Sequence, residues 1–312
     1  MTRVAAIDCG TNSIRLLVAD VDPARGILVD IERRMEIVRL GEGVDRTGRL
    51  APAALARTYV ACEQYAEVVR ATGAEAVRFV ATSASRDVDN RDDFVAGVRE
   101  RLGVDPEVVT GDTEAQLSFA GATRELAHGD VDPPYLVVDI GGGSTEFVLG
   151  SNKPTAARSV DVGCVRMTER HLRDDPPTSD QVAAARADIE AAVRSAGELV
   201  PLAAARSLVG LAGSVTTVAA MALDLPAYDA ERIHHSRMSR AVVHDVAGRL
   251  LGMTHDQRSA LPFMHPGRVD VIGAGALILA VILEQVTVDE VVVSEHDILD
   301  GIAWSLALAG ED

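Results

Sequence analysis

Aromatic residues are scarce in this sequence and make up only 3% of its 312 residues. Hydrophobic residues still account for 47% of the chain, so the buried cores must be built from aliphatic side chains. Charged residues make up 25%, which is typical of a soluble globular protein. A chain of this length is long enough for two domains of ordinary size, each with its own core.

Cysteine is also rare. The three cysteines are widely spaced and odd in number: Cys9, Cys62 and Cys164. Neither a disulfide framework nor a zinc-binding pattern can be drawn from them.

Basic residues are too few for a protein that binds nucleic acid. Lys and Arg total 30 against 47 Asp and Glu, and the net charge is −17. A nucleic-acid-binding protein would show a basic face. A phosphate-rich substrate would also be repelled, unless backbone amides, an arginine or a divalent cation reversed the field around it.

Long hydrophobic runs are missing. The longest apolar run spans residues 271–283, which is too short to cross a membrane, and we interpret it as a buried helix. The N-terminus shows no basic-then-apolar secretion signal. We therefore predict a cytoplasmic protein with no membrane partner.

The most informative feature that is present is an internal repeat. An apolar run, an aspartate and a turn of small residues occur at 4–13 and again at 136–144. Asp139 follows Asp8 by 131 residues, and Ser144 follows Ser13 by the same distance. Residues 80–83 and 211–214 repeat this spacing, and 104–109 resembles 288–293 with a larger offset. Two periods of this length indicate a duplicated domain, because solenoid repeats are much shorter.

Each half reads as a β-hairpin followed by helices that alternate with short buried strands. This alternation predicts an α/β fold with mixed sheets. We predict a first domain at 1–128 and a second at 129–312, whose last helix could pack back on the first. The boundary falls in the polar, proline-containing segment 128–134. The predicted helices span 52–72, 90–102, 112–127, 179–200, 239–251 and 266–285.

The two turns suggest phosphate binding. A turn of glycines and small residues lets several backbone N–H groups point at one anion, with an aspartate before it to hold a metal ion or a water. A lone triple glycine such as 141–143 would be interpreted as a tight hairpin. The repeat at Asp8 and the polar residues at 144–146 favour the anion cradle.

The motif at 139–146 resembles the signature of the exopolyphosphatase / guanosine pentaphosphate phosphohydrolase family. Further matches lie in order at 8–13, 81–86, 111–115 and 210–214. The resemblance spans nearly the whole chain and is closest to the short, two-domain members. It implies duplicated actin-like (ribonuclease H-like) domains with a cleft between them.

The resemblance also implies the catalytic residues. Glu114 matches the family's catalytic base, a suitable role if its surroundings let it take a proton from water. From the residues alone, Glu114 would be a first-turn charge favoured by the helix dipole. Arg86 matches the active-site arginine, which can bind phosphate oxygens bidentately. Its simpler interpretation is an exposed arginine paired with Asp87 or Asp89.

The same resemblance implies a divalent-cation site, for which oxygen ligands on a short turn suit Mg²⁺ or Mn²⁺. Its predicted ligands are Asp139, Ser144, Glu146 and, from the first domain, Asp8. The predicted phosphate-binding residues are Gly10, Thr11, Asn12, Ser13, Gly141, Gly142, Gly143, Ser144, Thr145, Gly213 and Ser214.

Two positions depart from the family pattern. Thr11 stands where the family often has serine. Leu299 stands where a similar family segment carries an arginine, so substrate contacts expected from that arginine are in doubt. His234 and His235 are interpreted as a surface pair, because the sequence shows no acidic partner at a metal-ligand spacing.

We therefore expect an exopolyphosphatase in which Glu114 activates a water that attacks the terminal phosphorus, with short chains preferred. The first alternative is a guanosine pentaphosphate 5′-phosphohydrolase. A kinase of the same superfamily and a non-catalytic binder of phosphorylated guanosine nucleotides are further alternatives. The family tendency and the apolar helices suggest a homodimer.

Overall fold

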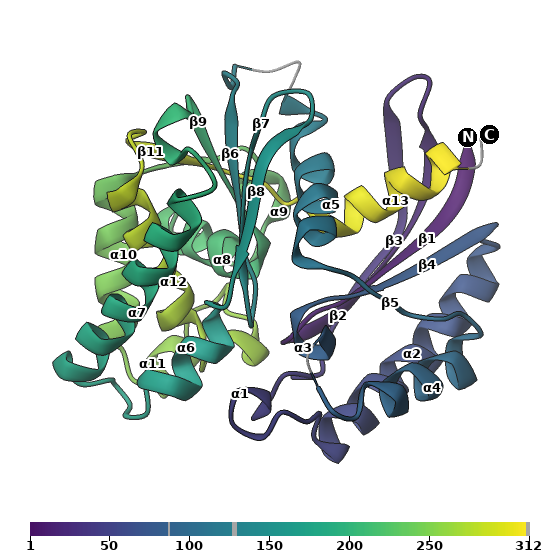
Figure 1. The fold of residues 1–312 in the computed structure, drawn as a ribbon, viewed down its shortest axis with the longest axis horizontal. Coiled ribbons are helices and arrows are strands. Elements are labelled where there is room, and N and C mark those ends of the chain that lie inside the picture. Colours follow the sequence, from purple (N-terminus) through teal and green to yellow (C-terminus); the bar gives the residue numbers. More distant parts are fainter. Residues whose placement is uncertain (87, 127–129, 310–312) are drawn as a thin grey trace. The chain divides into compact units, whose positions relative to one another are not determined.

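The computed structural model describes residues 1–86, 88–126 and 130–309 (Figure 1). The chain forms two compact units. The first comprises Met1–Arg124 and Asp297–Asp312, and the second comprises Glu125–His296. The predicted boundary at 128/129 lies outside the described residues.

The first unit is built on a five-stranded mixed sheet. The first three strands form an antiparallel meander, and the two others run parallel to the first strand. Their order across the sheet is β3 (Ile27–Ile37), β2 (Ser13–Asp22), β1 (Thr2–Cys9), β4 (Ala76–Ala81) and β5 (Glu107–Val108).

Helices cover both faces of this sheet. One face packs on a core that includes Tyr65 and Phe94, and the other on a core that includes Trp304 of the C-terminal helix. The last helix thus belongs to the first unit, as Figure 1 shows in yellow. The helices are α1 (Val44–Thr47), α2 (Pro52–Thr72), α3 (Ser83–Arg86), α4 (Arg91–Leu102), α5 (Gly111–Thr123) and α13 (Ile298–Ala309).

The second unit repeats the plan with a six-stranded mixed sheet. Strands β6, β7 and β8 form an antiparallel meander, and β9 and β11 run parallel to β6. The order is β10 (Arg237–Ser239), β11 (Glu290–Val293), β9 (Ser207–Leu211), β6 (Tyr135–Ile140), β7 (Thr145–Gly150) and β8 (Pro154–Val160). The prediction of two mixed α/β sheets is confirmed.

The helices of the second unit surround one large aliphatic core. The predicted buried helix in the apolar run is confirmed, because twelve consecutive residues of α12, from Ile272 to Leu283, are buried. In the part of the chain that the structure describes, no helix has the length and apolar character needed to span a membrane. The helices are α6 (Cys164–His171), α7 (Ser179–Gly197), α8 (Ala212–Ala222), α9 (Ala230–Ile233), α10 (Arg240–Gly252), α11 (His255–Ser259) and α12 (Ile272–Gln285).

The predicted helix boundaries are correct where a glycine ends the helix. Helix α2 has the predicted bounds, and Gly73 ends it in the left-handed conformation (φ 69°). Elsewhere they differ by a few residues: the helix predicted at 266–285 is a 3₁₀ turn at Pro266–Arg268 followed by α12. Asn90, the first residue of the helix predicted at 90–102, stands at the N-cap position of α4, but its side chain forms no capping hydrogen bond and pairs with the backbone of Leu50.

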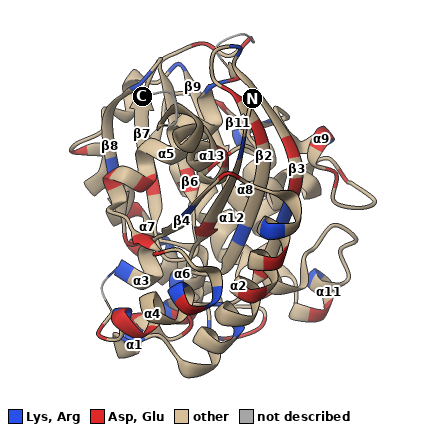
Figure 2. Ribbon diagram, turned by 90° about the vertical axis from the view of Figure 1, so that its right-hand side faces the viewer, with Lys and Arg blue, Asp and Glu red and all other residues tan. Residues whose placement is uncertain are grey.

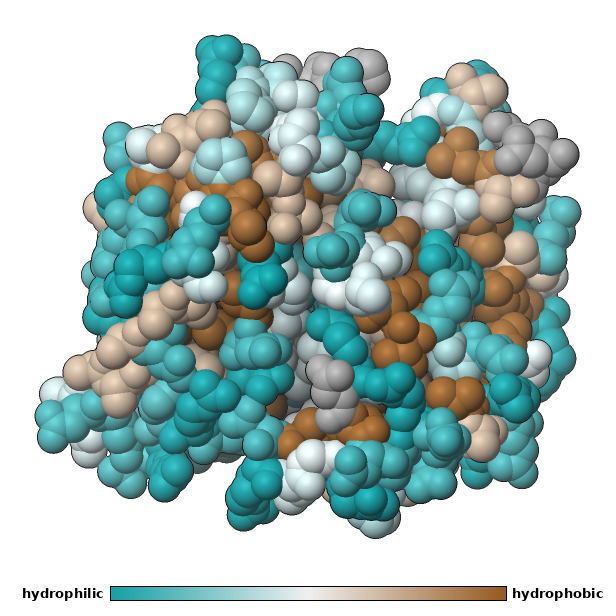
Figure 3. All heavy atoms as spheres, in the orientation of Figure 1, coloured by the Kyte–Doolittle hydropathy of each residue, from teal (hydrophilic) through white to brown (hydrophobic). Residues whose placement is uncertain are grey.

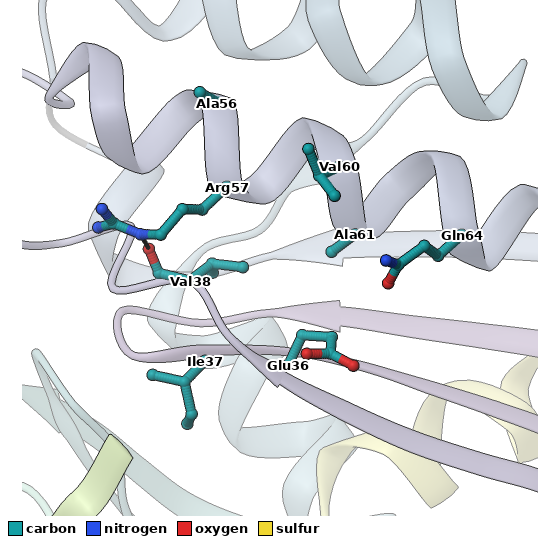
Figure 4. Close-up of a pocket in the computed structure, with 8 residues that line it drawn as sticks. All are labelled: Glu36, Ile37, Val38, Ala56, Arg57, Val60, Ala61 and Gln64. Atoms are coloured by element: carbon teal, nitrogen blue, oxygen red, sulfur yellow. Dashed lines mark hydrogen bonds between the residues drawn. The ribbon is translucent and has the colours of Figure 1, made fainter. Parts of the chain in front are cut away.

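The surface carries both signs of charge. Acidic residues recur along the edge strand β3 (Figure 2). The face in Figure 3 is mostly hydrophilic, with smaller apolar patches. A pocket of about 380 Å³ lies between α2 and β3 (Figure 4), and none of its lining residues belongs to the predicted site. It is lined by Glu36, Ile37, Val38, Ala56, Arg57, Val60, Ala61 and Gln64.

Candidate active site

The repeat in the sequence corresponds to two hairpin turns with the same closing hydrogen bond. In the first unit, the N–H of Gly10 donates to the carbonyl of Ser13 at 2.9 Å. In the second unit, the N–H of Gly141 donates to the carbonyl of Ser144 at 3.0 Å. Each turn joins two antiparallel strands, so the 131-residue repeat has the same local geometry in both units.

The turn of the first unit is braced by its neighbours. The hydroxyl of Thr11 lies 2.9 Å from the hydroxyl of Ser83, the first residue of α3. This contact joins the motif at 8–13 to the motif at 81–86. Gly41 packs against Thr11 so closely that a Cβ on Gly41 would lie 2.3 Å from the Thr11 methyl group. The carbonyl of Asn12 accepts the N–H groups of residues 38 and 39. The Thr11 side chain therefore supports the turn, and its hydroxyl is already engaged.

Arg86 and Glu114 lie in direct contact within the first unit. Nη2 of Arg86 is 2.6 Å from Oε2 of Glu114, and its Nε donates to the carbonyl of Val109 at 3.1 Å. Thr110 caps α5 by accepting the N–H of Thr113, which places Glu114 in the first helical turn. The Glu114 side chain is only 10% exposed, so it is not a solvated first-turn charge.

Asp8 is held by an arginine that sequence reasoning missed. Arg15 donates to Oδ2 of Asp8 from Nε (3.0 Å) and Nη2 (2.6 Å), and it also pairs with Asp297. Burial raises the pKa of the Asp8 carboxyl, and Arg15 only partly offsets that effect. Counting strand positions outward from the turn would have found this pair, because Asp8 and Arg15 are register partners across β1 and β2.

The same counting places two predicted metal ligands side by side in the second unit. Asp139 on β6 and Glu146 on β7 are register partners, and both are buried. Oε1 of Glu146 accepts the hydroxyl of Ser159 at 2.7 Å. Ser144 is buried at the turn between them. The hydroxyl of Thr145 instead donates to the carbonyl of Val162 at 2.7 Å, so it supports the hairpin.

The glycine turn of the second unit is packed against the start of α6. The N–H groups of Cys164 and Val165 donate to the carbonyls of Gly141 and Gly142. A Cβ on Gly163 would lie 2.4 Å from the backbone of Gly142, so this close approach requires glycine. The carbonyls of the turn are therefore directed to the helix.

Two further arginines adjoin the predicted phosphate-binding turns of the second unit. Nε of Arg166 donates to the carbonyl of Gly143 at 2.8 Å. Nη1 of Arg268 donates to the carbonyl of Gly213 at 3.0 Å. Ala212, just before Gly213, has a positive φ of 67°, which is unfavourable for a residue with a Cβ. Sequence reasoning missed both arginines because neither lies in a glycine motif.

Leu299 has a structural role in place of the arginine of the similar family segment. It is 1% exposed and belongs to the core of the first unit. Its acidic neighbours are paired instead: Asp297 with Arg15, and Asp300 with Arg33 at 2.6 Å. The local positive charge thus comes from strands β2 and β3.

Comparison with known proteins identifies the family. The Ppx/GppA phosphatase family profile matches residues 17–309. The chain belongs to this family. The predicted resemblance is therefore confirmed.

Three relatives are similar to the chain over nearly their whole length. The chain is 54% identical to Exopolyphosphatase 2 of Mycobacterium tuberculosis, over 98% of this chain and 99% of that protein. A crystal structure of an exopolyphosphatase-like protein superposes with a TM-score of 0.96 at 40% identity, covering 100% and 99% of the two chains. The Ppx/GppA family member of Aquifex aeolicus gives a TM-score of 0.82 at 29% identity, covering 100% and 99%.

Proposed function

We propose that this Ppx/GppA family protein is an exopolyphosphatase that hydrolyses the terminal phosphate of inorganic polyphosphate and prefers short chains. Similarity to Exopolyphosphatase 2 over nearly the whole of both chains supports the substrate class. The observation that carries the reaction type is the partly buried contact between Arg86 and Glu114. Arg86 is the proposed phosphate-binding cation and Glu114 the proposed base, and their contact lies at the first turn of α5.

The residues of the second unit fit a divalent cation. Asp139, Glu146 and Ser144 offer carboxylate and hydroxyl oxygens on one short hairpin, which is the donor set that Mg²⁺ and Mn²⁺ prefer. We propose that Mg²⁺ binds at these residues. A bound ion would neutralise phosphate charge in a protein whose net charge is −17.

In the proposed reaction, Glu114 takes a proton from a water whose oxygen attacks the terminal phosphorus. The P–O bond to the neighbouring phosphate breaks, and a chain shorter by one phosphate leaves together with orthophosphate. Arg86 binds oxygens of the phosphoryl group and offsets their charge in the loose transition state. The backbone amides of the glycine turns bind phosphate oxygens.

A phosphate-release assay tests the proposal. Polyphosphates of graded length and guanosine pentaphosphate are compared, with and without Mg²⁺ and without any phosphate acceptor. We expect Mg²⁺-dependent release from short polyphosphate, at a higher rate than from guanosine pentaphosphate. Release that requires an acceptor would indicate a kinase. Rates that rise steadily with chain length would contradict the preference for short chains.

Glu114→Gln separates the enzyme from a non-catalytic binder. We expect turnover to fall by about 10²–10⁴, the usual contribution of a general base, while polyphosphate binding is retained. Asp112→Asn is the matched control, because Asp112 is an exposed acidic residue in the same first turn. Unchanged release by Glu114→Gln would show that another residue is the base.

A homodimeric state and a cytoplasmic location stay predictions. Light scattering coupled to size-exclusion chromatography tests the first, and a monomer at micromolar concentration would contradict it. Fractionation of the source cells tests the second.

A further inference from the structure

We propose a second metal site, formed by Glu125, His234 and His296 in the second unit and selective for a divalent transition metal such as Zn²⁺ or Co²⁺. Each residue offers one ligand atom, and these three atoms lie within 4.8 Å of one another. The cluster shares no residue with the candidate active site. It also corrects the interpretation of His234 as a surface histidine without an acidic partner.

One oxygen of the Glu125 carboxylate contacts a ring nitrogen of each histidine. Oε2 of Glu125 lies 3.3 Å from Nε2 of His234 and 3.4 Å from Nδ1 of His296. The partners are separated by 109 residues between Glu125 and His234, so no local spacing in the sequence could reveal them. The side chains are 55%, 21% and 30% exposed, respectively, so an ion and its water ligands can reach the cluster from solvent.

Neighbouring groups fix the orientation of His234. Its ring stacks on His235 at a centroid distance of 3.7 Å, and His235 adopts a positive φ of 59°. The backbone N–H of His235 donates to the carbonyl of Val293 at 2.7 Å. Such support from outer residues is what positions metal-binding histidines in proteins.

The donor set distinguishes this cluster from the proposed Mg²⁺ site. Two imidazole nitrogens and one carboxylate suit Zn²⁺, Co²⁺ or Ni²⁺, whereas Mg²⁺ prefers oxygen ligands. Three protein ligands leave a fourth position for water. The two sites can therefore be occupied by different ions at the same time.

One hydrogen bond opposes binding. The N–H of Glu295 donates to Nδ1 of His234 at 3.1 Å, so in the metal-free protein the ring proton lies on Nε2 and points to Glu125. A metal ion bound at Nε2 requires the other neutral tautomer, so the single ring proton would move from Nε2 to Nδ1 by exchange with solvent. The Glu295 N–H must shift away, and we therefore expect micromolar affinity, not the tighter binding of a preformed zinc site.

The site has a defined place along the chain. Glu125 is the first residue of the second unit, and His296 is its last. The chain enters the unit at one ligand and leaves it at another. A bound ion would therefore reinforce the 3.4 Å contact that already joins the first and last residues of this unit.

The test is a Co²⁺ titration of the full-length protein in excess Mg²⁺, followed by absorption spectroscopy and calorimetry. We expect one Co²⁺ per chain, with visible bands of a nitrogen-containing site, and competition by Zn²⁺. His296→Ala and Glu125→Gln each remove a metal ligand. Each should therefore lower Co²⁺ affinity by more than the roughly 10- to 100-fold that follows when a residue supporting a ligand is lost. Glu125 is half-exposed, so its substitution is compatible with folding.

His244→Ala is the matched control. His244 on α10 lies 3.4 Å from Glu284, and among the described residues it belongs to no group of three such ligands. Its substitution should leave Co²⁺ affinity unchanged. Equal binding by the wild type and by both cluster variants, or binding abolished by excess Mg²⁺ alone, would overturn the proposal. Neither outcome depends on hydrolysis of polyphosphate, so the proposed function is tested separately.

Discussion

Arg86 donates a hydrogen bond of 2.6 Å to Glu114, and the two residues come from different helices of the first unit, α3 and α5. The two groups predicted to act on the substrate thus pair with each other. An incoming phosphate offers oxygens that compete with Glu114 for the guanidinium. Transfer of Arg86 from the carboxylate to the phosphate would leave Glu114 available to a water.

Arg86→Lys tests this exchange. Lysine keeps the charge but cannot bind phosphate and carboxylate in the planar manner of a guanidinium. We expect kcat to fall on the order of 10³, as for other arginines that stabilise phosphoryl transfer. KM should change less. Arg49→Ala is the control, because Arg49 is 57% exposed and lies 3.9 Å from Asp89. A loss confined to KM would show that Arg86 only binds substrate.

The hairpin carboxylates predict opposite effects on activity and stability. Asp139 and Glu146 are buried register partners, and like charges directly opposite each other destabilise a sheet. Asp139→Asn should raise the Mg²⁺ concentration needed for half-maximal phosphate release by about tenfold or more. The same change should leave unchanged or raise the melting temperature measured without metal. Asp180→Asn, in the first turn of α7, serves as the control. A lower melting temperature with unchanged Mg²⁺ dependence would contradict the metal assignment.

Much of the fold could be predicted because its signals are local. The aspartate-glycine turns, the glycine after α2 and the apolar run of α12 each determine their own structure. Contacts between residues far apart in sequence could not be predicted in this way. Arg15 with Asp297 and Glu125 with His234 are brought together only when the sheets and helices pack. The strand register that pairs Asp139 with Glu146 was within reach of sequence reasoning, because it follows from the turn.

The carboxylates that share Arg15 predict a pH dependence of stability. Burial opposes ionisation of Asp297, but the charge of Arg15 and hydrogen bonds from Arg15 and the Leu299 N–H hold its pKa below the ordinary value. A depressed pKa stabilises the folded state above the unfolded value of about 3.9, and this stability is lost as the pH falls. Asp8 behaves in the opposite way, because burial raises its pKa.

Asp297→Asn should therefore lower the free energy of unfolding at neutral pH by about 1.5–3 kcal/mol, the usual worth of a hydrogen bond to a charged group, because Arg15 keeps Asp8 as a partner. It should also reduce the dependence of stability on pH below about 4. Asp8→Asn should have a much smaller effect on stability while lowering phosphate release. Urea unfolding between about pH 3 and 7 measures both variants. If Asp297→Asn and Asp8→Asn lowered the free energy of unfolding equally, the two carboxylates would contribute equally to stability and the prediction would be wrong.

Alanine substitutions at Gly163 and Gly248 test the packing of the turn at 141–143, with Gly248 as the control position. A Cβ on Gly163 would lie 2.4 Å from the backbone of Gly142, whereas a Cβ on Gly248 in α10 would have nothing within 4 Å. Gly163→Ala should lower the free energy of unfolding by about 1–3 kcal/mol because backbone must move. Gly248→Ala should raise it by roughly 0.5–1 kcal/mol, since alanine favours the helix.

Because the displaced backbone is the proposed phosphate cradle, Gly163→Ala should also weaken polyphosphate binding, and Gly248→Ala should not. If both variants bound polyphosphate like the wild type while Gly163→Ala was destabilised as expected, the turn at 141–143 would be a structural hairpin only.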